Sequence, residues 1–337
     1  MCETSRIPGG HNLRALISGG TGFVGSHLAR FLITEGVEVF VFSSTRGESA
    51  ADRNPKIRYI QADICDVAAV TRVFEESQPD EIYHLAGVSS VPASRQFPRQ
   101  VLEINVLGTF NLFEAASRMQ SFPRVLNVST GQVYAAAGEA ARPLDEQCPV
   151  QPANWYATSK VMAELLASQY TDRKGAFLIN ARPFNHSGPG QSSDFVLSTL
   201  ASQVAEAEAG LRPASIKVGD LSVVRDFTDV RDVVRAYYLL LRSGRNGEVY
   251  NVCSGVARQV SYALEFLQSL AEIEIKVEVE PSRLRPNETR QIFGDPSKIQ
   301  KETGWRPAIP FETTVRDLLD YWRAQIRLKQ AANPCPV

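Results

Sequence analysis

A short strand, a glycine-rich turn and a helix follow one another near the start of the chain, and this order restricts the fold most. Residues 13–18 form an apolar run typical of a buried strand. Seven residues with four glycines follow, and then apolar residues recur at helical spacing. Such a turn brings backbone N–H groups close to a pyrophosphate, and the helix N-terminus adds a positive dipole end. We therefore expect a dinucleotide site rather than a plain glycine loop, with cofactor contacts from Gly19, Gly22, Phe23, Val24 and Gly25.

The rest of the first half alternates between predicted strands and helices. Further buried strands are expected at 37–42, 57–60, 82–85 and 125–128, and a long amphipathic helix at 101–116. This order predicts an α/β fold with a doubly wound parallel Rossmann sheet. Asn105 lies inside the long predicted helix, where a satisfied interior amide is the simplest interpretation.

The second half is less regular and predicts a smaller, discontinuous C-terminal substrate domain. We expect helices at 156–170, 229–241 and 311–328, strands at 177–181 and 249–252, and a proline and glycine loop at 182–190. The expected division assigns 13–182 with 229–255 to the cofactor domain and 183–228 with 256–328 to the substrate domain. The termini, 1–12 and 329–337, are expected to be flexible.

Ligands bind at the carboxyl ends of strands in such sheets. The glycine turn, the segment Leu85-Ala86-Gly87 and the pair Ser129-Thr130 all lie at predicted strand ends, so we expect them at one edge. The small residues Ala86 and Gly87 would let a cofactor lie across that edge.

The second predicted strand ends in Ser43-Ser44-Thr45-Arg46, without the carboxylate that an NAD site usually places there. Ser43 and the Arg46 guanidinium suit a 2′-phosphate, so NADP(H) is favoured over NAD(H), which stays open. Asp63, followed by Ile64, is placed to meet the adenine edge. The alternative interpretation of Asp63 is a helix cap.

Tyr156 and Lys160 are four residues apart, which puts both on one face of a helix. Tyrosine is a poor acid near neutral pH because its pKa is about 10, and a nearby ammonium favours the phenolate. The pair is therefore a candidate proton-transfer device, although the spacing alone is common on helix surfaces.

Composition excludes several classes of function. The net charge of −1 gives no attraction to nucleic acid or acidic membranes, and no apolar run approaches the roughly 20 residues that span a bilayer. The first thirteen residues are polar and lack an apolar signal core. The five cysteines are scattered without a Cys-x-x-Cys pattern, and the four histidines lack metal-ligand spacing. We expect no metal, and a reducing cytoplasm fits best.

Taken in order, these motifs resemble the extended short-chain dehydrogenase/reductase family over about residues 13–328. The resemblance is carried by the glycine turn, His84-Leu85-Ala86-Gly87, Asn105-Val106-Leu107-Gly108-Thr109, Ser129-Thr130, and Tyr156 with Lys160. It implies that Thr130, Tyr156 and Lys160 form the catalytic set. Tyr156 would exchange a proton with a substrate oxygen that Thr130 holds. Lys160 would lower the pKa of Tyr156 and bind the nicotinamide ribose, and Pro183 would also contact the cofactor.

Later segments resemble the nucleotide-sugar branch of that family and are similar to GDP-mannose 4,6-dehydratases and the related GDP-6-deoxy-4-keto-mannose reductases. They are 182–186, 188–191, 224–232 and 284–288. The resemblance implies that Arg225 and Arg285 grip the substrate diphosphate, as paired guanidinium forks suit that group. Ser89, Ser90 and Asn185 are further candidate substrate contacts.

The residues after Thr130 favour a reductase. Dehydratases of this branch carry a glutamate two positions after the catalytic threonine, often preceded by aspartate, whereas this chain has Gly131 and Gln132. An amide does not exchange a proton near neutral pH, so elimination should be lost or impaired. The expected reaction is reduction of GDP-4-keto-6-deoxy-D-mannose by NAD(P)H, giving a GDP-6-deoxyhexose such as GDP-D-rhamnose.

Other interpretations stay open. One is a nucleotide-sugar 4,6-dehydratase or 4-epimerase with tightly bound NADP, and a more remote one is a non-catalytic cofactor-binding protein. The resemblance also implies a homodimer formed by the helices after Pro98 and after Tyr156. Nucleic-acid binding is poorly supported because no basic stripe with interleaved aromatics occurs.

Overall fold

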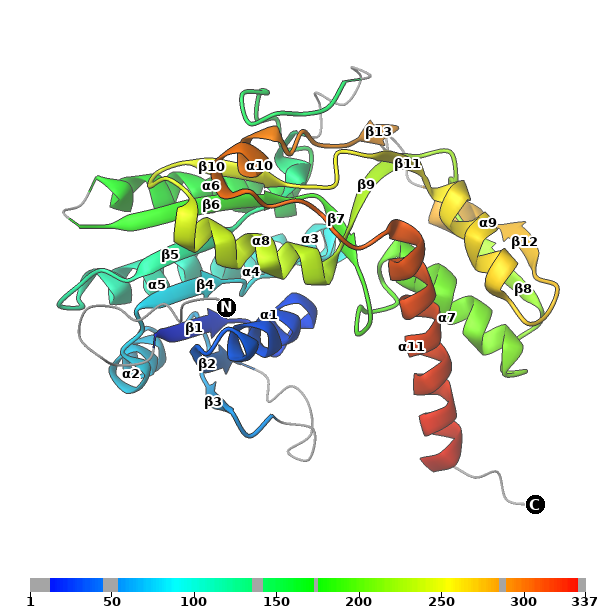
Figure 1. Ribbon diagram of the computed structural model, residues 1–337, viewed down its shortest axis with the longest axis horizontal. Helices are drawn as coiled ribbons and strands as arrows, with labels where there is room; N and C mark the ends of the chain where they lie inside the picture. The colour runs from blue at the N-terminus through cyan, green and yellow to red at the C-terminus, as the bar shows by residue number, and fades with distance from the viewer. Residues whose placement is uncertain (1–12, 45–53, 135–141, 173–174, 285–288, 333–337) are drawn as a thin grey trace.

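The computed structural model describes residues 13–44, 54–134, 142–172, 175–284 and 289–332, and a seven-stranded sheet forms its centre (Figure 1). The strand order is β10-β6-β5-β4-β1-β2-β3, and every neighbouring pair is parallel. The predicted doubly wound Rossmann sheet is therefore confirmed. Its strands are β1 Arg14–Ser18, β2 Glu38–Ser43, β3 Ile57–Gln61, β4 Glu81–His84, β5 Arg124–Val128, β6 Phe177–Pro183 and β10 Val249–Val252.

Both faces of this sheet are buried, which is why its strands read as continuous apolar runs. In β1, Ala15 and Ile17 belong to one core cluster and Leu16 to another, because successive side chains point to opposite faces. Helices α1 Phe23–Thr34 and α8 Val230–Ser243 pack on the first face. On the second lie α2 Val67–Ser77, α5 Gly108–Ser117 and α6 Trp155–Thr171.

The long helix predicted at 101–116 is interrupted. It consists of α4 Pro98–Leu102, the π-helical turn η1 Glu103–Leu107, and α5. Single π turns often occur at functional positions, and Asn105 lies in this one. The short helix α3 Val91–Gln96 precedes it.

A smaller lobe lies to the right of the sheet in Figure 1 and is built on its own core. Its helices are α7 Val196–Glu208, α9 Val260–Leu270 and α11 Phe311–Ala332. One small sheet joins β7 Asn185–Ser187, β9 Val224–Asp229, β11 Ala257–Gln259 and β13 Gln291–Ile292. Another pairs β8 Ser215–Val218 with β12 Lys276–Val279, which the short turn η3 Pro281–Arg283 follows.

Three expectations differ from these elements. The loop predicted at 182–190 contains the end of β6 and all of β7, and α11 continues past 328 to Ala332. Ile299 of α10 Ser297–Thr303 and the following Trp305 belong to the core cluster on the first face of the large sheet, although the expected division placed them in the smaller domain. Trp305 donates its indole N–H to the Asp232 carbonyl at 2.9 Å, which holds this segment against α8.

The buried Asp226 ties β9 to two later segments. Its carboxylate accepts hydrogen bonds from the Ser254 N–H and hydroxyl, the Gly255 N–H and the Gly294 N–H at 2.6–3.3 Å. These donors fix the strand that carries the neighbouring Arg225, one of the predicted substrate ligands.

Candidate active site

The glycine turn has the conformation that a dinucleotide site requires. Gly19 has a φ of +69°, and a Cβ there would lie 2.9 Å from the Ala86 backbone. A Cβ on Gly25 would lie 2.5 Å from the Gly20 Cα, so helix α1 packs closely on the turn. Gly22 caps α1 without a side-chain hydrogen bond, and the first intrahelical bond runs from the Ser26 N–H. The N–H groups of the first helical turn are therefore available to phosphate oxygens, and the turn fits a dinucleotide.

The adenosine end is described in part. Ser43 is the last residue of β2, one position past the strand predicted at 37–42, while Arg46 lies outside the described residues. Asp63 is exposed, and its carboxylate accepts the Cys65 backbone N–H at 2.9 Å. Asp66, rather than Asp63, caps the helix that follows, so the cap interpretation of Asp63 is wrong. Ile64 is buried with its side chain against Gly108.

Residues 85–88, here called the cofactor loop, follow β4 and lie beside the glycine turn. The N–H groups of Leu85 and Ala86 donate to Ser18 Oγ at 3.1 and 3.2 Å. A Cβ on Gly87 would lie 3.4 Å from Lys160 Nζ, so this loop also reaches α6. The predicted convergence of these strand ends at one edge is thus present.

Thr130, Tyr156 and Lys160 come together as predicted, and all three are buried. Tyr156 and Lys160 occupy the first turns of α6, which Asn154 caps by accepting the Ala157 N–H at 2.9 Å. Burial raises the pKa of Tyr156, and a hydrogen bond with Thr130 opposes that change. The Thr130 hydrogen bond therefore favours the phenolate of Tyr156, and the effect expected of Lys160 on this pKa stays a prediction.

The Lys160 amine donates to the Val128 carbonyl at the end of β5, 2.8 Å away. Burial lowers the pKa of Lys160 to about 8, and the Glu164 carboxylate one turn later opposes this shift. The ammonium thus lies at the carboxyl end of β5, close to Gly87 of the cofactor loop.

Gly131 and Gln132 form the wall behind Thr130. A Cβ on Gly131 would lie 2.9 Å from the Phe184 ring, so the ring fills the place where a larger residue would begin. The Gln132 side-chain carbonyl lies 3.5 Å from the side-chain nitrogen of Asn154. The backbone N–H of Gln132 donates to Thr130 Oγ1 at 3.2 Å. An amide and an aromatic ring line this side of the site.

The predicted substrate ligands come from several separate elements. Ser89 is exposed, and the Ser90 hydroxyl caps α3 by accepting the Ala93 N–H at 3.3 Å. Asn185 lies on β7, and Arg225 on β9 donates to the Val224 carbonyl at 2.8 Å. Arg285 lies outside the described residues. Pro183 ends β6 beside these strands.

Several contacts were not anticipated from the sequence. Phe23 of the glycine turn stacks on His186 with a centroid distance of 6.2 Å, and His27 donates to the Pro189 carbonyl at 2.8 Å. Ser129 Oγ is buried without a hydrogen-bond partner among the described residues, at the strand end where a ligand is expected. Only its position after a predicted strand could have drawn attention to it.

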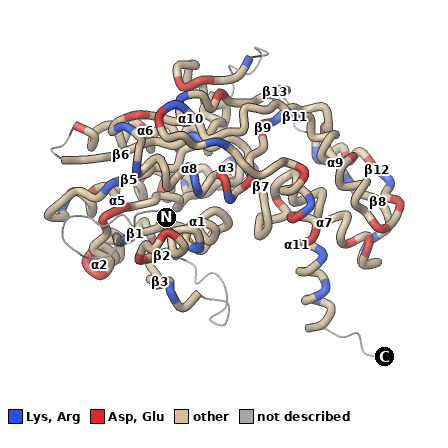
Figure 2. The backbone as a smooth tube through the Cα atoms, in the orientation of Figure 1, with Lys and Arg blue, Asp and Glu red and all other residues tan. Residues whose placement is uncertain are grey.

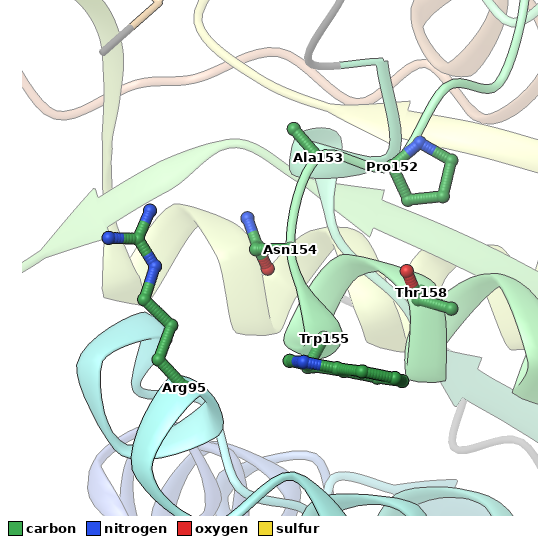
Figure 3. A pocket seen from close by; sticks show the side chains of 6 residues that line it. All are labelled: Arg95, Pro152, Ala153, Asn154, Trp155 and Thr158. Atoms are coloured by element: carbon green, nitrogen blue, oxygen red, sulfur yellow. The ribbon is translucent and has the colours of Figure 1, made fainter. Parts of the chain in front are cut away.

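A pocket of about 400 Å³ opens beside the N-terminus of α6 (Figure 3). Arg95 extends from α3 on one side, and the Trp155 ring lies flat on another. Asn154 also contacts Gln132, so this pocket lies next to the wall behind Thr130. Its lining consists of Arg95, Pro152, Ala153, Asn154, Trp155 and Thr158.

The described residues contain no group of three or more His, Cys, Asp or Glu side chains that could hold a metal ion. Within the same residues, no helix has the length and apolarity needed to cross a bilayer. Acidic and basic positions are interspersed along the backbone in Figure 2.

Comparisons with known proteins agree with these features. The family model for GDP-mannose 4,6-dehydratase matches residues 16–318. GDP-6-deoxy-D-mannose reductase of Pseudomonas aeruginosa is 36% identical over 93% of this chain and 98% of its own. GDP-mannose 4,6-dehydratase of Vibrio cholerae is 28% identical over 90% of this chain and 92% of its own.

Solved structures resemble this one throughout. RMD from Pseudomonas aeruginosa complexed with NADPH aligns with a TM-score of 0.80 and 34% identity, over 93% of this chain and all of that one. Thermus thermophilus UDP-glucose 4-epimerase with NAD aligns with a TM-score of 0.83 and 29% identity, over 92% and 99%. By sequence and by fold, the chain belongs to the GDP-mannose 4,6-dehydratase family.

Proposed function

We propose that this protein is an NAD(P)H-dependent reductase of GDP-4-keto-6-deoxy-D-mannose, forming a GDP-6-deoxyhexose such as GDP-D-rhamnose. The observation that carries the proposal is a complete Thr130, Tyr156 and Lys160 set beside a wall that has Gln132 where elimination needs a carboxyl group. Phe184 reinforces the argument, because its ring leaves no room for an aspartate at position 131. The name and the 36% identity of the Pseudomonas aeruginosa reductase favour the same reaction.

The residues divide the work of ketone reduction. The nicotinamide, when bound, supplies the hydride, while the protein supplies orientation and the proton. Tyr156 donates its phenolic proton to the carbonyl oxygen as negative charge develops there. Thr130 holds that oxygen through its hydroxyl, and the Lys160 ammonium stabilises the phenolate left on Tyr156.

We infer NADP(H) as the preferred cofactor, with NAD(H) as the alternative. Strand β2 ends in hydroxyl residues without a carboxylate, so no negative charge at the strand end repels a 2′-phosphate. Complexes of the similar structures with NADPH or NAD support binding of either dinucleotide.

We assign 13–182 with 229–255 to the cofactor domain and 183–228 with 256–328 to nucleotide-sugar binding, except for the segment 297–305 that packs on the cofactor domain. Arg225 and Arg285 would grip the diphosphate between them, and Ser89, Ser90 and Asn185 would face the sugar. Two unpaired cysteines, Cys148 and Cys253, are buried as thiols, which suits a cytoplasmic location.

The test is absorbance of reduced nicotinamide with purified protein, NADPH and freshly prepared GDP-4-keto-6-deoxy-D-mannose, with GDP-mannose in a parallel cuvette. We expect oxidation of NADPH with the keto sugar only, and its loss in Tyr156→Phe. Conversion of GDP-mannose without net cofactor change would instead identify a dehydratase. Inactivity with both, but tight NADPH binding, would favour the non-catalytic interpretation.

We further propose a homodimer formed by α6 and the neighbouring π turn and α5. Exposed apolar side chains gather on these adjacent elements, namely Leu107, Phe110, Trp155, Met162 and Leu165. Light scattering should give a dimer for the wild type and a monomer for Leu165→Glu. Leu328→Glu is the matched control, since the exposed fractions of Leu165 and Leu328 are 62% and 64% and only the first lies in this patch. A dimeric Leu165→Glu protein would contradict the assignment.

A further inference from the structure

A chain of buried hydrogen bonds runs beneath the cofactor loop. Ser18 Oγ lies 2.7 Å from His84 Nδ1, and His84 Nε2 lies 2.8 Å from Thr109 Oγ1. Thr109 Oγ1 in turn lies 2.6 Å from the carbonyl oxygen of Asn105. All four residues are at most 1% exposed, so bulk water does not compete for these bonds.

The direction of every bond in this chain follows from its ends. Ser18 Oγ accepts two N–H groups of the cofactor loop, so its own proton is donated to His84 Nδ1. His84 must then carry its proton on Nε2 and donate it to Thr109 Oγ1. The Thr109 hydroxyl donates to the Asn105 carbonyl, which has no proton to give. Burial, assisted by the charge of Lys160, lowers the pKa of His84 to about 3, so the ring stays neutral.

The Asn105 side chain joins the end of this chain to the catalytic helix. Its Oδ1 accepts the Val88 N–H at 2.7 Å, and its Nδ2 donates to the Val88 carbonyl at 3.1 Å and to Ser159 Oγ at 2.9 Å. Ser159 Oγ donates to the Tyr156 carbonyl at 2.7 Å. A Cβ on Gly87 would lie 2.9 Å from Asn105 Oδ1, so the loop is held tightly against this amide.

We propose that His84 and Thr109 are positioning residues, which set the separation between the cofactor loop and Tyr156 through Asn105. The proposal rests on the proposed reductase function. Asn105 lies in the π turn η1, so the Thr109 hydroxyl provides an anchor for a carbonyl in an irregular part of the helix. A displacement of about 1 Å between reacting groups can lower a rate roughly 100-fold, so loss of this anchor should reduce hydride transfer.

The kinetic test compares Thr109→Val with Thr109→Ser under saturating NADPH. Valine has the shape of threonine without the hydroxyl, and serine retains the hydroxyl. We expect kcat to fall by roughly 10- to 100-fold in Thr109→Val with little change in KM for the keto sugar, and to recover largely in Thr109→Ser. Wild-type kcat in a folded Thr109→Val protein would overturn the proposal, as would an equal loss in both variants.

A second test uses ¹⁵N-histidine NMR on the full-length wild-type protein, with His84→Gln to assign the signal. The chain requires a neutral His84 with the proton on Nε2, and this proton should exchange slowly with solvent. The Nδ1–H tautomer would overturn the proposed polarity. This experiment needs no substrate. It therefore still tests the direction of the hydrogen bonds through His84 if NADPH oxidation is absent and the reductase function fails.

Discussion

The buried ion pair behind Lys160 yields a prediction that links stability to catalysis. Glu164 lies one turn after Lys160, and its two carboxylate oxygens accept from Arg182 Nε and Nη2 at 2.9 and 2.6 Å. The side chains are 10% and 6% exposed, and Arg182 also donates to the Tyr134 hydroxyl at 2.7 Å. Replacing Glu164 by glutamine leaves the Arg182 charge buried without its counter-ion.

The expected loss is large because solvent does not reach the pair. Removing one partner of a buried, hydrogen-bonded ion pair costs about 3–5 kcal/mol. The same change removes the negative charge that supports the Lys160 ammonium, so the pKa of Lys160 should fall further below its usual value. Lys160 should therefore lose its proton at a lower pH than in the wild type.

Two measurements check this prediction. Urea denaturation should show the stated loss in free energy of unfolding for Glu164→Gln, and the kcat/KM profile should lose its alkaline limb at a lower pH. Glu103→Gln is the control, because Glu103 also pairs with an arginine, Arg99, but these two side chains are exposed. The apolar double variant Glu164→Leu/Arg182→Met should recover much of the stability but not the pH profile. A loss below about 1 kcal/mol in Glu164→Gln, as for a surface pair, would refute the reasoning.

Three further perturbations have defined outcomes. Gly131→Ala should cost about 1–3 kcal/mol in thermal or urea unfolding, because its Cβ would meet the Phe184 ring, and unchanged stability would show that the ring moves freely. Lys160→Met should abolish reduction yet be more stable than the wild type by up to about 3 kcal/mol. The pKa of Lys160 is about 8 in the folded protein and 10.5 in the unfolded chain, so the stability gained by the variant is full below pH 8 and shrinks as the pH rises to 10.5. A difference in free energy of unfolding that does not change with pH would contradict this. Asp226→Ala should raise KM for the keto sugar through Arg225, with a smaller effect on KM for NADPH, and equal effects would argue against that route.

Much of the predicted cofactor site could be read from spacing along the sequence. The glycine turn needs residues without Cβ within a seven-residue segment, and β1 and α1 flank it directly, so sequence neighbours alone specify it. The i,i+4 relation of Tyr156 and Lys160 is likewise a property of one helix. Burial on both sheet faces made the strands visible as apolar runs, although the π turn inside the predicted helix at 101–116 left no such signal.

The second lobe was harder to predict because its strands are short and pair across long separations. Helices α7 and α9 were missed, and α10 returns to the core of the large sheet. The N-terminus of α2 shows the same difficulty on a small scale. Aspartate is a good N-cap residue, so Asp63 and Asp66 are both suitable by residue type, and only the path of the backbone makes Asp66 the cap.

The sequence by itself predicted the doubly wound parallel sheet, the candidate set of Thr130, Tyr156 and Lys160, and the absence of a carboxyl group at position 132, because each depends on residue identity or on spacing along the chain. The tertiary structure alone decided what surrounds them. Ser18 meets His84 across 66 positions, and Asn105 meets Ser159 across 54. Such contacts depend on how strands order themselves in the sheet and which helices cover each face, and no local pattern encodes the resulting tautomer of His84.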